Sequence, residues 1–493
     1  MVWIFGILDK IGKAMCGIVG ILSNQNQAEL MLSIKKMKRA IAHRGPDDDG
    51  EFVQNGIALG HQRLSIIDTS HGGHQPMFSR DEQIVVVFNG EIYNFIELRE
   101  MLKGQYAFKT NSDTEVIIAA YLIWGIQFIE RLNGMFAIAL YDKSQDKLFL
   151  IRDRLGEKPL YFSSNEKAFV FSSEVRALLT TEWVRKKISI SGLRQYAMCQ
   201  TVAYPNTILE DVFSVLPGTY LEVSSSGWNE FRYWDFQDQS TLVGSIDETK
   251  RKVKDELYRS VEWRMRADVS FGAFLSGGLD SSVLVSLMSK ISDKPIHTFS
   301  IGFEEKQWDE SDIAKLVSAR FQTEHTNVVL NGNVFLDQLE NAINALDHPS
   351  GDGVNSYVVS KVTRSYGIKM AMSGLGGDEV FGGYPIFERI KKTQKSRNFI
   401  PWNWIPNTSA KFLLSKKWNG VQVDRVMHLL ATKEMSNSDV FQSDRVVNGN
   451  ETLSELFLNA ETAHYENKLV EWRDNGKEFV YSSISEAEMK GYM

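Results

Sequence analysis

The chain has 493 residues, more than one hydrophobic core usually organises, which predicts two to four domains. Its 55 Lys and Arg face 62 Asp and Glu, a net charge of -7 with no basic run, which argues against nucleic acid as a partner. No stretch approaches 18 consecutive apolar residues, and the two cysteines provide no disulfide framework, so we expect no membrane span and a reducing, cytoplasmic location.

The N-terminal segment ends at Met15, directly before the first cysteine. Residues 1–15 open with a short apolar run that has no basic residue before it and is interrupted by Asp9 and Lys10, which makes a poor signal peptide. We interpret this segment as a leader or as a start site assigned upstream of Met15. As the first residue, Cys16 would carry a thiol beside a free α-amine with a pKa of ~7.7 to 8.0, able to accept the thiol proton. Alternatively, Cys16 is a small buried residue at the start of a strand.

Residues 16–236 form the first predicted domain. Short segments rich in β-formers alternate with Gly, Asn and Asp, and two stretches, 27–42 and 112–124, have helical periodicity. The expected strand segments are 16–22, 56–67, 84–94, 135–142, 147–153, 168–173 and 219–223. This pattern predicts an α+β domain with sizeable sheets.

A polar linker, residues 237–246, separates this domain from a second one over 247–493. There the expected strands, 269–275, 296–302 and 368–373, alternate with helical segments. Such alternation is typical of a doubly wound α/β domain with a parallel sheet. The stretch from about 390 to 450 is expected to be helical.

Two glycine-rich turns follow strands of the second domain. The first, SGGLDSS at 276–282, opens a helix, so its backbone amides and glycines suit a phosphate, although it lacks the Lys-Ser/Thr ending of a Walker loop. The second turn, 373–379, carries Asp378 as the first carries Asp280. We expect the two carboxylates to hold one Mg²⁺ at the carboxyl edge of the sheet. Taken singly, each turn is equally a tight strand-to-helix connection.

Together these motifs resemble those of the glutamine-hydrolysing asparagine synthetase family over residues 15–493. The matching motifs are MCGIVG at 15–20, HRGPDDDG at 43–50, HQRLSIID at 61–68, FNGEIYN at 88–94, SDTEV at 112–116, SGGLDSS at 276–282 and SGLGGDEVFGGY at 373–384. The resemblance implies an αββα sandwich of the N-terminal-nucleophile hydrolase type, followed by a doubly wound pyrophosphatase-loop domain.

The resemblance also implies roles in a glutaminase site. Cys16 would attack the glutamine side-chain amide, with the Asn89 amide and the Gly90 N–H as the oxyanion hole. Arg63 would bind the glutamine α-carboxylate, and Glu91 with Asp113 would bind its α-ammonium. Further glutamine-binding positions are Leu64, Ser65, Ile66 and Ile67. Each residue also has an ordinary structural interpretation: Arg63 as a surface ion-pair partner, Asp113 as a helix start and Asn89-Gly90 as a hairpin turn.

In the second domain the resemblance implies an ATP site. The phosphate loop would comprise Ser276, Gly277, Gly278, Asp280 and Ser281, and the nucleotide would be lined by Leu275, Ile301, Ser373 and Gly374. The implied chemistry is attack of a substrate carboxylate on the α-phosphate, which gives an acyl-adenylate and pyrophosphate. Ammonia, passed through an interior tunnel, then displaces AMP.

Three departures from the family pattern leave the acceptor open. Leu375 stands where many members have an acidic residue, whose role Asp352 could fill. The stretch 347–353 occupies the region that presents polar and basic residues to aspartate in well-known members. The chain also stops at EAEMKGYM, where members continue, so we expect an incomplete synthetase domain.

Three functions follow from these observations. The first is an ATP-dependent ligase that makes asparagine from aspartate and glutamine. The second applies the same chemistry to another carboxylate, such as a sugar uronate, and the third is a fragment that binds ATP or glutamine without amide transfer. All three involve small molecules rather than nucleic acid or membrane, and a homodimer is left open.

Overall fold

The computed structural model describes residues 15–236, 244–304, 306–307, 309–330, 332–350, 353–397, 422, 437–448, 453, 455–457 and 481–492. The chain divides into two compact units. The first holds the described residues of 1–185, 211–347 and 352–376, and the second those of 186–210, 348–351 and 377–493. No helix among the described residues is long and apolar enough to cross a membrane.

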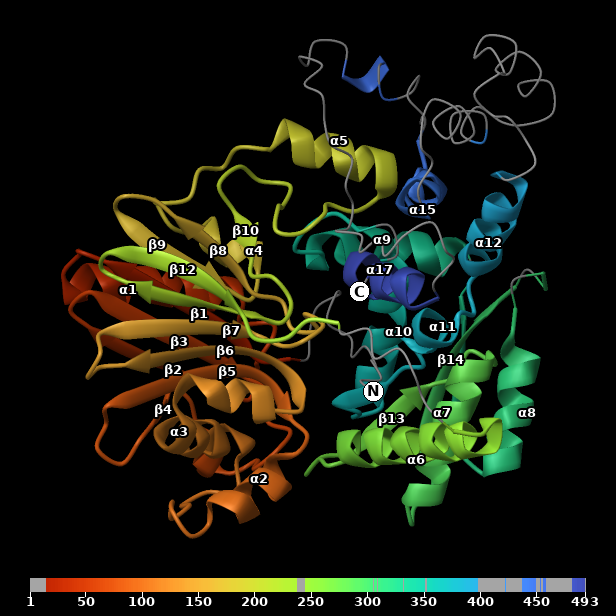
Figure 1. Ribbon diagram of the computed structural model, residues 1–493, viewed down its shortest axis with the longest axis horizontal. Coiled ribbons are helices and arrows are strands. Elements are labelled where there is room, and N and C mark those ends of the chain that lie inside the picture. The colour runs from red at the N-terminus through yellow and green to blue at the C-terminus, as the bar shows by residue number, and fades with distance from the viewer. Residues whose placement is uncertain are drawn as a thin grey trace. The chain divides into compact units, whose positions relative to one another are not determined.

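Two six-stranded antiparallel sheets form the N-terminal part of the first unit (Figure 1). One has the order β10-β8-β9-β1-β3-β2 and the other the order β12-β11-β7-β6-β5-β4. The strands are β1 (Gly17–Ser23), β2 (Asp48–Gln54), β3 (Ile57–Arg63), β4 (Met77–Phe78), β5 (Ile84–Ile92), β6 (Gly134–Asp142), β7 (Lys147–Arg152), β8 (Tyr161–Ser164), β9 (Ala168–Ser172), β10 (Phe213–Ser214), β11 (Thr219–Ser224) and β12 (Gly227–Arg232).

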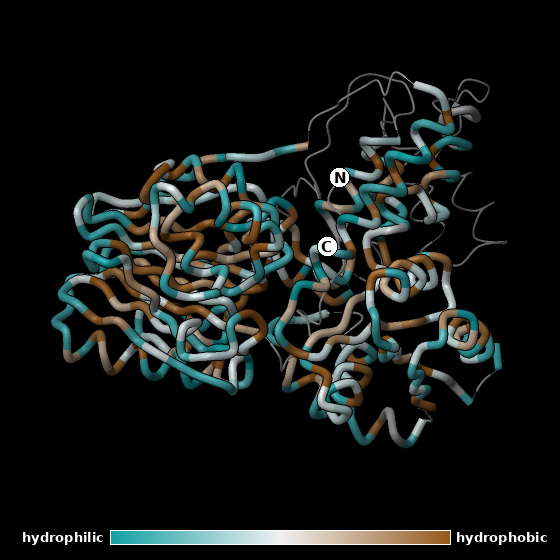
Figure 2. The backbone as a smooth tube through the Cα atoms, turned by 90° about the horizontal axis from the view of Figure 1, so that it is seen from below, coloured by the Kyte–Doolittle hydropathy of each residue, from teal (hydrophilic) through white to brown (hydrophobic). Residues whose placement is uncertain are grey.

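Strand β5 shows how the layers are packed. Its side chains alternate between two faces, so Val85 and Val87 enter the core between the sheets while Val86 and Phe88 enter a second core against the helices. That second core contains residues of α2 (Phe95–Leu102) and α3 (Asp113–Trp124). Helices α1 (Gln27–Ala40) and α4 (Val175–Leu178) pack on the other sheet. The predicted αββα sandwich is therefore confirmed, and Figure 2 shows many of its inner segments as apolar.

Local signals explain most of these elements. The side chain of Asn26 caps α1 and that of Ser112 caps α3, which places both helices close to their predicted ranges. Each expected strand segment contains a strand. The hairpin interpretation of Asn89 and Gly90 is wrong, because both lie inside β5 and pair with β6.

The rest of the first unit contains a four-stranded parallel sheet of order β15-β14-β13-β16. It consists of β13 (Phe271–Phe274), β14 (His297–Phe303), β15 (Glu324–Leu330) and β16 (Met370–Met372). The helices of this region are α6 (Ile246–Arg264), α7 (Leu279–Ile291), α8 (Ser311–Phe321), α9 (Gly332–Ala345) and α10 (Gly353–Ser365). Strands alternating with helices confirm the predicted α/β architecture, and β15 is an additional strand.

The second unit is helical in its described residues. It contains α5 (Ile190–Cys199), α11 (Gly377–Phe381), α12 (Pro385–Arg397), α15 (Asn437–Arg445) and α17 (Tyr481–Tyr492). A buried cluster joins α5, α12, α15 and α17 through Cys199, Phe387, Phe441 and Ile484. Of the stretch expected to be helical from about 390 to 450, most lies outside the described residues.

Candidate active site

Cys16 immediately precedes β1, and its thiol faces the backbone of Leu64. The Leu64 N–H donates to Sγ at 3.4 Å, and the thiol donates to the Leu64 carbonyl at 3.5 Å. Burial raises the pKa of the Cys16 thiol to about 11, against the opposing effects of the Leu64 hydrogen bond and the Arg63 charge. The thiol is therefore protonated near neutral pH, and nucleophilic attack needs a base.

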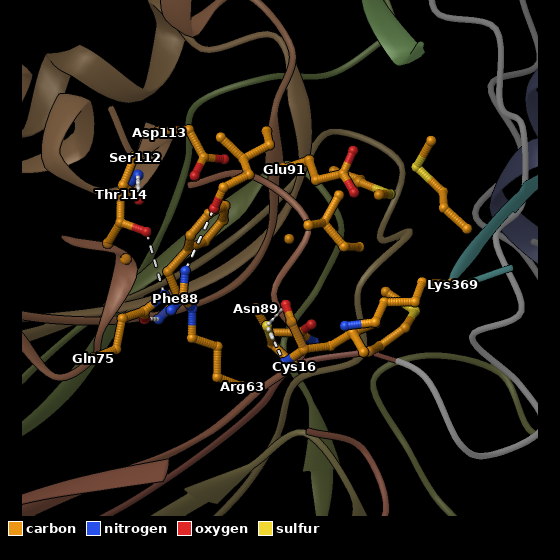
Figure 3. A pocket seen from close by; sticks show the side chains of 18 residues that line it. Cys16, Arg63, Gln75, Phe88, Asn89, Glu91, Ser112, Asp113, Thr114 and Lys369 are labelled. Carbon is orange, nitrogen blue, oxygen red and sulfur yellow. Dashed lines mark hydrogen bonds between the residues drawn. The ribbon is translucent and has the colours of Figure 1, made fainter. Parts of the chain in front are cut away.

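A pocket beside Cys16 gathers the predicted glutamine-site residues (Figure 3). Those that line it are Cys16, Arg63, Leu64, Ile66, Ile67, Asn89, Gly90, Glu91 and Asp113. Ser65 is absent from this lining, and its backbone N–H donates to Asp47 Oδ2 at 2.9 Å. Lining residues that the sequence did not single out are Met15, Gly73, Gln75, Phe88, Ser112, Thr114, Met135, Lys369 and Met370.

Arg63 ends β3 with a buried guanidinium held by a backbone loop. Its Nη1 donates to the Ser70 carbonyl at 2.9 Å, and its Nη2 donates to the carbonyl of Asp68. A Cβ on Gly73 would stand 1.8 Å from Nη2, so only glycine leaves room for this placement. These carbonyls fix the guanidinium without cancelling its charge, and Arg63 is not the surface ion-pair residue of the structural interpretation.

Two buried carboxyl groups face the same pocket. Glu91 is 3% exposed, and its Oε1 has no hydrogen-bond partner among the described residues. Burial raises the pKa of Glu91 to about 8, although Lys158 opposes the rise. Burial also raises the pKa of Asp113 to about 6, while its Oδ2 accepts the Ile92 N–H at 2.9 Å. A cation entering the pocket would restore the ionised form of both groups.

Asn89 and Gly90 bring hydrogen-bonding groups to the pocket from the middle of β5. The Asn89 side chain is fully buried, and neither its Nδ2 nor its Oδ1 has a partner in the described part of the chain. An unpaired buried amide costs about 1–3 kcal/mol, which a bound ligand would relieve. Gly90 has φ +155, and a Cβ there would meet the Met135 carbonyl at 2.0 Å.

Two residues that the sequence analysis did not assign to the site support or border this pocket. Gln75 Oε1 accepts the Phe88 N–H at 2.6 Å, and its Nε2 donates to Thr114 Oγ1 at 3.2 Å, which ties β5 to α3. The glycine pair in HGGHQP at 71–76 was the available signal. Lys369, just before β16, donates to Asp47 Oδ2 at 2.7 Å, and no local pattern links these distant residues.

The first glycine turn connects β13 to α7. Leu275 is buried beneath it, Gly277 has φ +83, and the hydroxyls of Ser276 and Ser281 lie 3.1 Å apart. Gly278 caps α7 without a side chain, so the first helical N–H groups have no side-chain cap. That arrangement suits an anion.

The second glycine turn packs on the first turn of α7. A Cβ on Gly374 would stand 2.7 Å from the Ser281 nitrogen and 3.1 Å from Asp280 Cβ. Ser373 and Gly374 therefore lie against the predicted phosphate loop, and Ile301 lies on β14 of the same sheet. Leu375 is 46% exposed and donates its N–H to Ser373 Oγ at 3.1 Å.

The predicted cation site involves both units. Asp280 belongs to the first unit and Asp378 to the second, so their joint role stays a prediction. The described residues contain no group of three or more His, Cys, Asp or Glu side chains that could hold a metal ion. Asp352 lies outside the described residues.

Known proteins match both parts of the chain. Residues 15–234 match the profile of the glutamine amidotransferase domain, and residues 252–475 match that of asparagine synthase. A Methanocaldococcus jannaschii protein assigned as glutamine-hydrolysing asparagine synthetase 2 is 38% identical over 399 residues, 75% of this chain and 76% of that protein. The glutamine-hydrolysing asparagine synthetase 1 of Bacillus subtilis is 36% identical, with 81% of this chain and 63% of that protein covered.

A third relative, the glutamine-hydrolysing asparagine synthetase B of Escherichia coli, is 30% identical over 77% of this chain and 67% of its own length. These relatives match most of this chain, which spans between about two thirds and three quarters of their lengths. The two profile matches fall on the sandwich and on the region of the parallel sheet. The chain belongs to the glutamine-hydrolysing asparagine synthetase family.

Proposed function

We propose that this protein makes asparagine from aspartate, using ammonia released from glutamine and activation of the aspartate carboxylate by ATP. The observation that carries the proposal is the pocket lined by the Cys16 thiol, the two proposed oxyanion donors, one guanidinium and two buried carboxyl groups. Three family relatives bear the name of this activity, which supports the same conclusion.

In the glutaminase step, the Cys16 sulfur attacks the side-chain carbonyl carbon of glutamine. In a chain that begins at Cys16, its α-amine takes the thiol proton and returns a proton to the leaving ammonia. Asn89 Nδ2 and the Gly90 N–H donate to the oxyanion, where one such donor contributes about 10²–10³ in kcat. Water then hydrolyses the glutamyl thioester and frees glutamate.

The charged groups of glutamine explain the remaining residues of the pocket. The Arg63 guanidinium matches the α-carboxylate, a planar anion suited to two parallel hydrogen bonds. Glu91 and Asp113 match the α-ammonium. Burial raises the pKa of both carboxyl groups, and the ammonium would favour their ionised form. Glutamine would thus supply opposite charges to these groups and hydrogen-bond partners to the buried Asn89 amide and Glu91 Oε1.

The synthetase step uses the two glycine turns. Ser276, Gly277 and Ser281 would contact the ATP phosphates at the start of α7, where the helix dipole favours anions. Asp280 adds a carboxylate in the same turn, so we include Mg²⁺, held by Asp280 and Asp378, in the proposal. When bound, Mg²⁺ would neutralise phosphate charge.

A second acceptor remains a candidate because of Leu375. Its exposed apolar side chain stands in the turn next to Gly374, where many family members carry an acid. This substitution favours a carboxylate other than aspartate, such as a sugar uronate. A cytoplasmic location and a homodimer belong to the proposal as well, the former because a low cysteine content suits a reducing compartment.

The experiment is pyrophosphate release by the purified chain with a panel of carboxylates, using either glutamine or ammonia as nitrogen source. Aspartate-dependent pyrophosphate together with equimolar AMP and asparagine supports the proposal. Turnover with a sugar uronate alone supports the second acceptor. Glutamine hydrolysis without pyrophosphate for any acceptor identifies a chain that does not amidate.

A further inference from the structure

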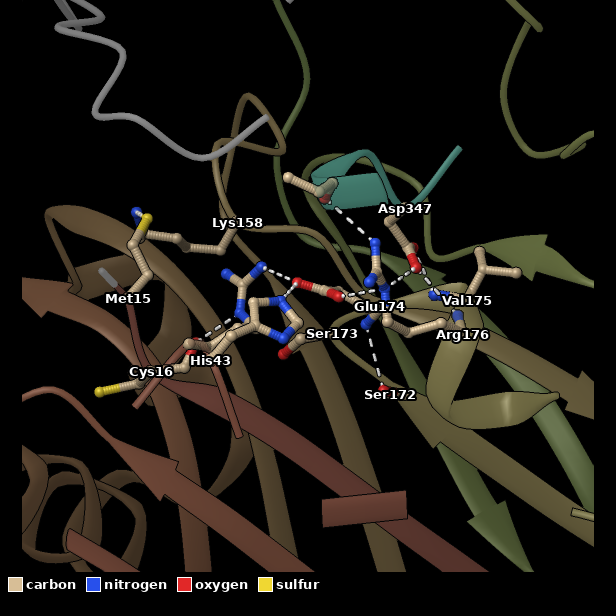
Figure 4. A network of polar contacts seen from close by, with 12 residues as sticks. Met15, Cys16, His43, Lys158, Ser172, Ser173, Glu174, Val175, Arg176 and Asp347 are labelled. Atoms are coloured by element: carbon tan, nitrogen blue, oxygen red, sulfur yellow. Dashed lines mark hydrogen bonds and ion pairs between the residues drawn. The ribbon is translucent and has the colours of Figure 1, made fainter. Parts of the chain in front are cut away.

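A buried carboxylate, Glu174, connects the nucleophile to a distant helix of the same unit (Figure 4). It follows β9 and is 4% exposed. Its Oε1 is 2.9 Å from both His43 Nε2 and Arg44 Nη1, and its Oε2 is 2.9 Å from Arg176 Nε. Burial would raise the pKa of Glu174, but His43 and Arg44 outweigh it and hold the value at about 2. The group is therefore a carboxylate anion throughout the neutral range.

Arg44 links Glu174 to the backbone of Cys16. Its Nε donates to the Cys16 carbonyl at 2.9 Å, and its own carbonyl accepts the Met15 N–H at 2.9 Å. A Cβ on Gly17 would stand 3.1 Å from Arg44 Cδ, so the arginine stem lies over the backbone directly after the nucleophile. The orientation of one guanidinium thus helps to fix the Cys16 backbone.

On the other side of Glu174, Arg176 and Asp347 link α4 to the end of α9. Asp347 accepts the N–H groups of Val175 and Arg176 and caps α4, whose N-cap residue Glu174 makes no side-chain cap. In return, Arg176 donates to the carbonyls of Asn344 and Ala345 at 3.3 and 3.1 Å, at the end of α9. The two helices therefore cap each other's ends.

We propose that Glu174 is a positioning residue for the Cys16 nucleophile and acts through Arg44. We propose further that Asp347, at the end of α9, supports this arrangement by binding Arg176, the other arginine beside Glu174. The inference rests on the proposed glutaminase function and deepens it: the glutaminase site is fully assembled only when the α9 end contributes Asp347. Asp347 is also the first residue of the stretch 347–353, which occupies the region that presents polar and basic residues to aspartate in well-known family members. The sequence motifs did not include Glu174 or Arg176.

The physical argument depends on burial. Removing the Glu174 charge leaves the buried Arg44 guanidinium next to a neutral group, which favours its reorientation toward other acceptors. Reorientation of Arg44 releases the Cys16 carbonyl, and misplacement of a reacting group by about 1 Å can cost about 10²-fold in rate. Among the described residues, no hydrogen bond or ion pair joins Glu174 to the residues proposed to bind glutamine, so the loss should appear in kcat more than in KM.

The test compares Glu174→Gln, Asp347→Ala and the double variant in the full chain. Asp337→Ala, an exposed position of the same helix α9, is the matched control. We expect glutamine-dependent kcat to fall about 10- to 100-fold in Glu174→Gln and about 5-fold in Asp347→Ala. The double variant should fall by less than the product of the two, because the residues act through one network.

Two further measurements separate positioning from loss of folding. In Glu174→Gln, synthesis with ammonia should stay within about twofold of the parent, because ammonia does not use Cys16. The rate at which iodoacetamide alkylates Cys16 is measured by mass spectrometry of the peptide at several pH values. Its pH dependence should change in Glu174→Gln and Asp347→Ala but not in Asp337→Ala. This readout holds even if the parent hydrolyses no glutamine, so failure of the proposed function is recognised separately. Unchanged glutamine kcat and alkylation in both variants, or equal losses with glutamine and ammonia in Glu174→Gln, would overturn the inference.

Discussion

The proposed glutamine pocket and the two proposed nucleotide turns are made of different parts of the chain. In the pocket, side chains from strands and from α3 are buried and held by hydrogen bonds, as for Arg63 and Asp113. In the turns, backbone groups dominate, and Leu279 at the start of α7 is 79% exposed. The pocket therefore depends on side-chain chemistry, and the turns on the absence of Cβ atoms.

The largest effect should come from Cys16→Ala, which removes the nucleophile of the pocket alone. Glutamine hydrolysis should fall by at least about 10³-fold, because no other described thiol lines the site. Ammonia-dependent pyrophosphate release should be retained. Assays with the two nitrogen sources check this, and comparable loss in both would show that the two regions are not chemically separate.

Asn89→Ala tests the unpartnered amide in β5. We expect kcat for glutamine hydrolysis to fall about 10²- to 10³-fold with a smaller change in KM, because Nδ2 is used mainly in the transition state. Asn229→Ala, at an exposed position of the edge strand β12, is the matched control. A rise in KM alone would instead make Asn89 a ground-state binding residue.

Gly374→Ala tests the nucleotide turns in the opposite way, by adding a side chain. The new Cβ would stand 2.7 Å from the Ser281 nitrogen, so the second turn must move away from the first. We expect ATP-dependent pyrophosphate release to fall about 10-fold while glutaminase activity stays unchanged. The control is Gly332→Ala, where a Cβ meets nothing within 4 Å. Equal activity of the two variants would contradict the close packing of the turns.

The same difference explains what the sequence could predict. The turns are local motifs, so glycine and strand patterns alone indicated an anion site. Arg63 and Asp113 gained a role only through the family resemblance, because the other residues that line the pocket with them, such as Cys16, lie far away in the sequence. Gly73, which leaves space for the guanidinium, and Glu174, which pairs with the distant residues His43 and Arg44, had no local pattern.

Strands show a similar limit. β15 escaped prediction because polar residues occupy it: His325 lies 3.0 Å from Thr298 and Asn327 accepts from Ser300 at 2.8 Å, across from β14. β12 is an edge strand that is exposed throughout and shows no alternation of burial. Hydrophobic periodicity finds strands that bury one face, and β12 and β15 lack that signature. The short strands β4 and β10, together with β2 and β8, also lie outside the expected segments.

The pH dependence of glutamine binding tests the two buried carboxyl groups. Burial raises the pKa of Glu91 to about 8 in the empty pocket, so below pH 8 this group is mostly protonated. An ammonium favours the carboxylate form, so binding releases a proton and affinity rises as pH increases toward 8. We expect KM for glutamine to fall about 10-fold between pH 6.5 and 8. Glu91→Gln should flatten this dependence, whereas Glu100→Gln, an exposed position of α2, should preserve it.

The smallest effect should come from Lys369→Met, where the parallel-sheet region borders the glutamine pocket. Lys369 donates to Asp47 Oδ2, which also accepts the Ser65 N–H, so the pair holds the loop that follows Arg63. Burial would raise the pKa of Asp47, but Lys369 and Ser65 keep it below its usual value. The Lys369 side chain is 39% exposed, and such pairs contribute about 0.5 kcal/mol, so KM for glutamine should rise only about twofold. Because screening weakens exposed pairs, this twofold difference should disappear at 1 M salt, whereas the losses in Asn89→Ala and Glu174→Gln should persist. A Lys369→Met loss that is large and independent of salt would mean that the pocket depends on this cation as strongly as on its buried side chains.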